Sequence, residues 1–510
     1  MNANDGSRHD DQGPAAKRDQ GRPAEARPTS KQIPSVQRSR ENFAARRGLR
    51  RLVQSDAPPT APMSIVDRLA GSPYANPMIQ VGGVDNSARK TIDFTLLLAE
   101  TMFRFGAGAL EVETSMIAVT AAFGLRNIEV DITNQSVSIN YAPKNATPIT
   151  LLRVVRSWTN NYAGLTQVHQ LVTEIVSGGV GREEAQRRLN DILRRPKPYQ
   201  RWMVTTSSGV FAACVVAVIG GGLAGALIAM GSTLLVGLLS RWLSRWRVPD
   251  FFITATGAFL VTAIALAFVR FEIPIQPGAV VTGGILLLLP SGRLVSAVQD
   301  AINGFPVTAA GRFLSVFLTF GAIVSGIAVA SAFGVLLGAN AKSVIDAPKS
   351  EPLPLYLALL LILFATVLIG VVEQTSPRLL IPTAMVGVLG YSVFFVVGQL
   401  GLGTRLAPAV AAAVVGILAR LIALRLGAPQ LVVAVPSILF LLAGLSIFRA
   451  MFVLTISNDS ALDGVIGLFN AIVVIMGVAA GVVLGDNLAR PLTKLGKLSA
   501  GIDPRRNRRR

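Results

Sequence analysis

The sequence has little of what metal centres and disulfide bonds need. Among 510 residues it has one cysteine, Cys214, and two histidines, His9 and His169. A single cysteine excludes intramolecular disulfide bonds and cysteine-built zinc sites, and two histidines exclude a histidine-rich metal centre. The sequence also lacks a Walker A motif and a dinucleotide-binding fingerprint. We therefore expect no metal, no cofactor and no ATP-driven step in this chain.

Charge is scarce in the middle of the chain. Between Arg201 and Asp486 there are 14 Lys or Arg and 9 Asp or Glu. The remaining basic residues lie toward the two ends and supply most of the formal net charge of +19. No basic stripe alternates with aromatic residues, so we interpret this charge as contact with anionic lipid, and we expect no nucleic-acid partner.

Long apolar stretches, in contrast, are abundant. A soluble core does not need so many of them, whereas a bilayer does, because about 20 helical residues cross about 30 Å of hydrocarbon. The predicted fold class is a mostly α membrane protein with about ten transmembrane helices, so the lipid bilayer is one expected partner. The predicted spans are 203–221, 223–240, 251–270, 276–292, 313–337, 353–373, 379–399, 406–424, 430–448 and 464–485.

The first 200 residues predict two parts. The first 60 residues lack the apolar core of a signal peptide, and residues 1–88 predict a disordered basic tail and linker. Residues 89–200 predict a small soluble α+β domain. Its expected elements are an amphipathic helix through Ile92 and Phe103, a helix over 109–123, a β-hairpin over 128–141 and helices over 148–160, 164–177 and 182–194.

The flanking charges predict the orientation. With the amino terminus inside, nine arginines flank the inner ends of the spans and five basic residues flank the outer ends. Ten spans then return the carboxyl terminus to the same side. The membrane part divides into halves at 201–342 and 343–489, followed by a basic tail at 490–510. Both termini and the soluble domain are thus expected in the cytoplasm.

The fourth and ninth spans resemble each other. Gly283–Arg293 and Pro436–Gly444 are each an apolar run that ends in a small-residue break, about 150 residues apart. Five spans separate them, and an odd number places the two halves in opposite orientations. This predicts the 5+5 inverted repeat of many secondary transporters. The alternative is that Leu- and Gly-rich membrane helices look alike by composition alone.

Several segments resemble the threonine/serine exporter family. They are Gly106–Thr114, Phe123-Gly124-Leu125, His169–Val172, Leu289–Gly292 and Pro436–Gly444. The resemblance covers about residues 90–489. It implies a cytoplasmic amino-terminal domain, ten spans in the bacterial inner membrane and export of small amino acids. Ser291 interrupts the family's Pro-Gly break, Ala443 replaces a proline at the second break, and Glu111 stands where arginine is common.

The two breaks are the predicted substrate-binding elements, because unwound backbone offers donors to a carboxylate and acceptors to an ammonium group. The alternative is ordinary helix kinking at Pro and Gly. The predicted binding residues are Pro290, Ser291, Gly292, Ala443, Gly444 and Arg449. Arg449 could instead extend to the outer surface.

Carboxylates near the membrane are the candidates for proton coupling, and Asp300 and Asp463 are the two predicted here. Asp300 could instead belong to an amphipathic helix at the inner interface, together with Arg293. Most of Glu272, Glu373, Asp463 and Asp486 are expected to be solvated, since they lie near span ends.

In the soluble domain the residues of interest are Gly106, Glu111 and Glu113. Paired carboxylates can do acid/base work, but the helix dipole alone favours acidic residues in a first turn. His169 is the only histidine of the domain, so no Ser-His-Asp set can form there.

These features favour a non-enzymatic secondary transporter that exports threonine and serine, driven by the proton motive force. The alternatives are a small-dicarboxylate exporter, with Arg293 and Arg449 facing one cavity, and a membrane-anchored enzyme or sensor acting through residues 89–200. A homo-oligomer is compatible with the sequence.

Overall fold

The computed structural model describes residues 86–143, 147–155, 158–338, 353–401, 403–456 and 461–499. Apart from residues 86–88, which form the start of a helix, the predicted tail at 1–88 lies outside the described residues. The predicted tail at 490–510 is described as far as Ser499, and up to there it continues the last helix.

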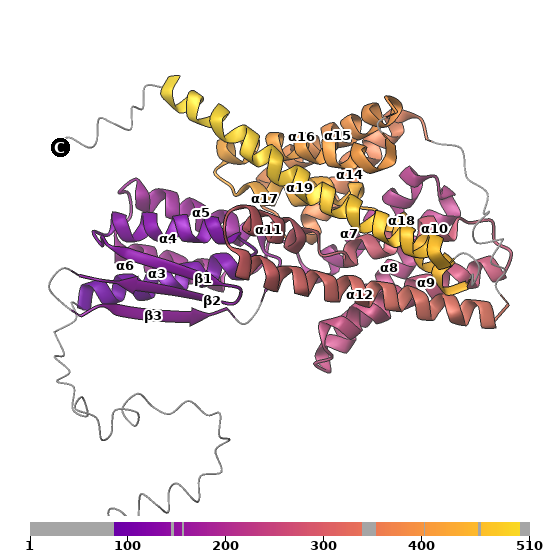
Figure 1. Cartoon of the computed structure of the whole chain (residues 1–510), viewed down its shortest axis with the longest axis horizontal. Helices are drawn as coiled ribbons and strands as arrows, with labels where there is room; N and C mark the ends of the chain where they lie inside the picture. Colours follow the sequence, from indigo (N-terminus) through magenta and orange to yellow (C-terminus); the bar gives the residue numbers. More distant parts are fainter. Residues whose placement is uncertain are drawn as a thin grey trace, which may run out of the picture. The chain divides into compact units, whose positions relative to one another are not determined.

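The amino-terminal domain packs helices on a small antiparallel sheet (Figure 1). The sheet has the order β1-β2-β3. Phe94, Phe103, Met116 and Ile139 lie in its core and are at most 1% exposed. The elements are α3 (Asn86–Arg104), α4 (Ala109–Ala122), β1 (Ile128–Thr133), β2 (Ser136–Tyr141), β3 (Ile149–Val154), α5 (Tyr162–Val176) and α6 (Arg182–Arg194).

The predicted hairpin is confirmed, but the predicted helix at 148–160 is wrong. Val130 pairs with Ile139 across β1 and β2, and Asn134 takes the turn with φ 35°. Residues 149–154 form β3, in which Leu151 pairs with Ile139 of β2. The segment Ile149–Val154 begins and ends with a β-branched residue. Pairing along the open edge of β2 outweighs the weak helical pattern.

Eight helices of the described chain are long and apolar enough to cross a membrane. Two further pairs are bent at a short break, by 58° and 45°, and counting each as one span gives the predicted ten. The eight helices are α7 (Arg201–Ile219), α8 (Gly222–Arg245), α9 (Asp250–Arg270), α12 (Pro306–Leu336), α14 (Leu355–Val372), α15 (Pro377–Gln399), α16 (Gly403–Leu426) and α19 (Ala461–Ser499).

The two bent pairs occupy the positions of the predicted fourth and ninth spans. The first is α10 (Pro277–Ile285) with the 3₁₀ turn η1 (Leu286–Leu288), followed by α11 (Ser291–Ile302). The second is α17 (Gln430–Ile438) with η2 (Leu439–Leu441), followed by α18 (Gly444–Ile456). The predicted ninth span, 430–448, runs across its break, whereas the predicted fourth span, 276–292, ends at its break and leaves most of α11 outside. In both pairs the bend lies at the predicted break.

The two sets of helices share a pattern of neighbours. Helix α9 packs on α12 as α16 packs on α19, and α7 packs on α8 as α14 packs on α15. Glycines allow backbone-to-backbone contact in both sets. A Cβ at Gly326 would clash with the carbonyl oxygen of Ala255, and a Cβ at Gly485 would clash with that of Ala413. Close approach through small residues is how membrane helices associate.

Candidate functional site

The two breaks have the same backbone geometry. The residue before each break is extended: Leu289 has φ −69° and ψ 130°, and Leu442 has φ −75° and ψ 143°. The Ser291 N–H donates to the Leu289 carbonyl, and the Gly444 N–H donates to the Leu442 carbonyl, both at 2.9 Å. Each break therefore brings a helix carboxyl end and a helix amino end together. Such ends carry unpaired backbone groups and partial charge.

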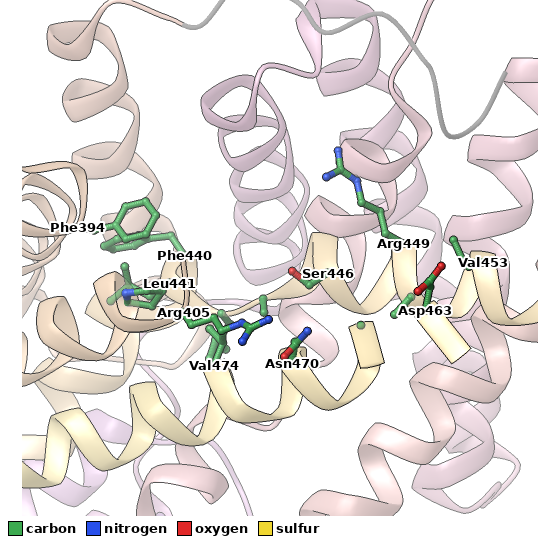
Figure 2. Close-up of a pocket in the computed structure, with 15 residues that line it drawn as sticks. Phe394, Arg405, Phe440, Leu441, Ser446, Arg449, Val453, Asp463, Asn470 and Val474 are labelled. Atoms are coloured by element: carbon green, nitrogen blue, oxygen red, sulfur yellow. The ribbon is translucent and has the colours of Figure 1, made fainter. Parts of the chain in front are cut away.

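A cavity of about 510 Å³ opens beside the second break, and we call it the second-break cavity. Its polar lining comprises Arg405, Ser446, Arg449, Asp463 and Asn470. Figure 2 shows the Arg405 side chain extending toward Asn470, whereas Arg449 extends away from both. Apolar contacts come from Phe394, Phe440 and Val474. The cavity thus combines two cations, one carboxylate, an amide and a hydroxyl group.

Three predicted residues meet in this cavity, namely Ala443, Arg449 and Asp463. Gly444 is buried behind it, where an added Cβ would lie 3.0 Å from Thr282 Cγ2. Sequence reasoning missed Arg405, which it used only to count flanking charges. It also missed Asn470, whose signal was a lone amide inside an apolar span.

A second cavity, of about 600 Å³, opens beside the first break, and we call it the first-break cavity. It contains the predicted residues Pro290, Ser291 and Gly292 together with Gly106 of the amino-terminal domain. An added Cβ at Gly292 would lie 3.1 Å from the Tyr162 hydroxyl, so this glycine leaves room for the tyrosine. The amino-terminal domain therefore covers this break directly.

Two residues of each cavity are equally spaced along the chain. Asp250 and Ser315 line the first-break cavity, and Arg405 and Asn470 line the second-break cavity. Arg405 follows Asp250 by 155 positions, and Asn470 follows Ser315 by the same 155 positions. Arg293 and Arg449 line different cavities. The dicarboxylate hypothesis required these two arginines to share one cavity.

Asp300 lies outside both cavities and is fully buried. Its Oδ2 forms an ion pair with Arg312 Nη1 at 2.6 Å, and its Oδ1 accepts from the Ala109 N–H at 2.8 Å. Arg312 Nη2 donates to the Ala107 carbonyl at 2.9 Å. The pair thus connects α11 and α12 to the start of α4. Its role in proton coupling stays a prediction.

The two predicted glutamates of α4 have different environments. Glu111 Oε1 lies 3.4 Å from His169 Nδ1 and lines a third cavity, whereas Glu113 is partly buried and lines none of the cavities described here. Gly106, at φ 100°, forms the turn between α3 and α4, a conformation that favours glycine.

Of the four carboxylates mostly expected to be solvated, Asp486 is buried and Glu373 is partly buried. Asp486 is 2% exposed and pairs with Arg420 at 2.8 Å and Arg490 at 3.1 Å. Glu373 lies at the end of α14 and lines the first-break cavity. Burial raises the pKa of Glu373 to about 7, an effect that the charge of Lys197 partly offsets. Contacts from the amino-terminal domain cause this burial, and the local sequence does not reveal them.

Comparison with known proteins matches the amino-terminal domain with the first membrane half, and the second membrane half separately. Family models described as "Putative threonine/serine exporter" and "Threonine/Serine exporter, ThrE" match residues 93–334 and 358–487. A probable threonine/serine exporter of Mycobacterium tuberculosis is 32% identical over 461 residues, covering 89% of this chain and 84% of the relative. The threonine/serine exporter of Corynebacterium glutamicum is 30% identical over 456 residues, covering 86% and 87%.

A more distant relative matches about half of the chain. The probable succinate transporter subunit YjjP of Klebsiella aerogenes is 24% identical over 239 residues, covering 46% of this chain and 88% of the relative. No solved structure matches. The matches over nearly the whole length, with the bent pairs and apolar helices described above, show a multi-pass membrane protein that belongs to the threonine/serine exporter family.

Proposed function

We propose that the protein is a secondary transporter that exports threonine and serine from the cytoplasm. The observation that carries this proposal is the mixed charge of the second-break cavity. A free amino acid presents a carboxylate and an ammonium group a few ångströms apart. Two arginines and Asp463 offer partners for both, in a cavity within the size range of small-molecule sites. The names of the relatives support the same substrate class.

Each group of the cavity has a role in this proposal. Arg405 binds the substrate carboxylate, because a guanidinium group can hold a carboxylate by two parallel hydrogen bonds. Asp463 binds the ammonium group. Ser446 and Asn470 are hydrogen-bond partners for the substrate hydroxyl, and Arg449 attracts the carboxylate on entry. Backbone at Ala443 and Gly444 supplies the helix-end charge.

The first-break cavity is the proposed counterpart on the side of the amino-terminal domain. Its residues Pro290, Ser291 and Gly292 occupy the same place in the first half as Ala443 and Gly444 in the second. If the halves are inverted repeats, the two cavities open to opposite sides of the membrane. Alternating access then means that one cavity is open while the other is closed, and that the two states interchange. The equally spaced lining residues and shared helix contacts support this arrangement.

The proposed energy source is the proton motive force, since the sequence has no ATP-binding motif. Asp300 and Asp463 are the predicted coupling residues, and Glu373 joins them as a carboxylate in the first-break cavity. The proposed orientation has both termini in the cytoplasm, supported by the excess of arginine at the inner flanks.

Efflux of radiolabelled threonine from loaded cells tests the proposal. Cells that express the chain should lose threonine faster than cells without it, and an uncoupler should abolish the difference. Equal efflux with and without the chain would contradict the substrate assignment. Chain-dependent efflux that resists the uncoupler would contradict only the proposed energy source.

A second candidate is the export of small dicarboxylates. Two observations favour it: Arg405 and Arg449 together give the second-break cavity an excess of positive charge over Asp463, and a relative is named a probable succinate transporter subunit. Competition in inverted vesicles separates the two candidates. Unlabelled serine should inhibit threonine uptake and succinate should not; the reverse result, with labelled succinate as the transported species, would favour the dicarboxylate.

A further inference from the structure

A third cavity, of about 360 Å³, lies where the amino-terminal domain meets both membrane halves, and we call it the interdomain cavity. Glu111 of α4 and His169 of α5 line it from the amino-terminal domain. Gln299 of α11 lines it from the first half. The second half contributes Arg420 of α16, Gln430 of α17 and Arg490 of α19. Side chains from six helices thus converge on one space.

Several polar atoms of this lining are buried and have no hydrogen-bond partner within the described chain. They are the acceptor Gln299 Oε1 and the donors Arg420 Nε and Gln430 Nε2. Glu111 Oε1 and His169 Nδ1 also make no hydrogen bond, and 3.4 Å separates them. A buried polar atom without a partner costs about 1–3 kcal/mol, so folded proteins rarely gather several of them. Their convergence on one cavity indicates a place for a polar ligand.

The charges of the lining indicate which kind of ligand. Arg420 and Arg490 are both positive, and both pair with the buried carboxylate of Asp486. Glu111 supplies a second negative charge, so the charges of these four described side chains, Arg420, Arg490, Asp486 and Glu111, sum to zero when His169 is neutral. The hydrogen-bond donors lie on α16 and α17, and the acceptors lie on α4 and α11. A neutral site arranged in this way matches a zwitterion, which has one carboxylate and one ammonium group. A dicarboxylate would bring two uncompensated negative charges.

We propose that the interdomain cavity binds a free α-amino acid from the cytoplasm and serves as a regulatory site separate from the transport cavities. The carboxylate accepts from Arg420 and Gln430, and the ammonium group donates to Glu111 and Gln299. A ligand held this way bridges the amino-terminal domain to α11 and α17, which belong to the two bent pairs. Occupancy therefore communicates the cytoplasmic amino-acid level to the two bent pairs. The identity of the amino acid and the cytoplasmic location rest on the proposed function; the site itself does not.

Equilibrium binding of radiolabelled L-threonine to the full-length protein in detergent tests the proposal. The wild-type chain should bind two molecules. Glu111→Gln and Gln430→Ala should each weaken one of the two by at least about tenfold, because Glu111→Gln removes the negative charge that faces the ammonium group and Gln430→Ala removes a hydrogen bond to the carboxylate. Glu113→Gln is the matched control on the same helix and should keep both. If each variant still binds one threonine molecule at the second-break cavity, that variant has folded.

Arg405→Ala separates this proposal from the proposed function. It should remove the other threonine molecule and leave the interdomain site intact. If Glu111→Gln and Gln430→Ala bind threonine as the wild type does, the interdomain site is wrong, whatever Arg405→Ala does. If Arg405→Ala changes neither binding nor efflux while Glu111→Gln still loses one molecule, the transport site is wrong and the interdomain site stands. Succinate that displaces threonine from the Arg405→Ala variant would overturn the zwitterion assignment.

Discussion

Arg312 and Asp300 form a buried ion pair, with 2.6 Å between Nη1 and Oδ2 and with 4% and 0% of the two side chains exposed. The guanidinium carbon of Arg312 also lies 5.1 Å from the ring centre of Phe103 and 5.2 Å from that of Trp158. One arginine at the start of α12 thus holds the end of α3, the start of α4 and the loop after β3. These contacts attach the amino-terminal domain to the first membrane half.

Loss of either partner should destabilise this attachment. Arg312→Met leaves the Asp300 carboxylate buried without its cation, and Asp300→Asn leaves Arg312 without its anion, each at a cost of about 3–5 kcal/mol. The double variant Asp300→Asn with Arg312→Met should cost less than the sum of the two single changes. Thermal unfolding in detergent measures all three, and strictly additive losses would contradict a direct pair.

Removal of a charge from the second-break cavity should slow efflux. Arg405→Ala and Asp463→Asn each take away one proposed partner of the zwitterion, and we expect threonine efflux to fall at least about tenfold in each. Arg425→Ala is the control for Arg405, because Arg425 is exposed on the same helix and outside this cavity. Equal efflux in Arg405→Ala and Arg425→Ala would exclude Arg405 from the transport site.

Gly292 and Tyr162 should be coupled. In Gly292→Ala the new Cβ meets the Tyr162 hydroxyl at 3.1 Å, which displaces the tyrosine or the first break. We expect slower efflux, restored in part when Tyr162→Phe removes the hydroxyl. Gly321→Ala provides the control, since a Cβ there has no neighbour within 4 Å. A Gly292→Ala variant that Tyr162→Phe does not improve would show that the contact is incidental.

The stability of the protein should depend on the protonation of Glu373. Its pKa of about 7 lies above the ordinary 4.5, so between these values the folded state keeps a proton that the unfolded state has released. Stability then falls as the pH rises from about 4.5 to 7 and levels off above. The other charged or titratable groups that line the cavity with Glu373 are Arg104, Tyr162, Asp250, Arg293 and Arg312, and Lys197 is the neighbouring cation that acts on its pKa.

Glu373→Gln should remove this fall in stability between pH 4.5 and 7, because glutamine does not titrate. At pH 8 the variant should be more stable than the wild type by on the order of 1–3 kcal/mol, and below pH 4.5 the difference should vanish. Thermal unfolding across pH 4 to 8 measures the effect. Parallel curves for both proteins would show that Glu373 does not titrate in this range.

Cysteine labelling should place the amino-terminal domain and the carboxyl terminus on one side. In a Cys214→Ser background, Trp202→Cys and Arg510→Cys should be protected from an impermeant thiol reagent in intact cells, whereas Leu400→Cys should react. Trp202 and Leu400 lie at the ends of α7 and α15, beyond most of each apolar span. Labels that place Trp202 and Arg510 on opposite sides would contradict both the even span count and the inverted repeat.

The sequence predicted the membrane class, the ten apolar segments and the position of both breaks. Hydropathy and helix-interrupting Gly and Pro residues can be recognised locally, without knowledge of tertiary contacts. It misassigned residues 149–154, because pairing with β2 is a tertiary contact that the periodicity of six residues cannot reveal. Asn470 and Glu373 were missed for a related reason. A single polar residue in an apolar span, or at its end, acquires its environment only from helices distant in sequence.

The glycines of the long helices limit which parts of the protein can move. At Gly326 and Gly485 the backbones of neighbouring helices touch without side chains between them, so either pair would lose its contacts if its members slid or separated. We therefore expect α9 with α12, and α16 with α19, to behave as two rigid helix pairs. In the proposed transport cycle we expect the change of shape in the two bent pairs, α10 with α11 and α17 with α18, and not within these two helix pairs.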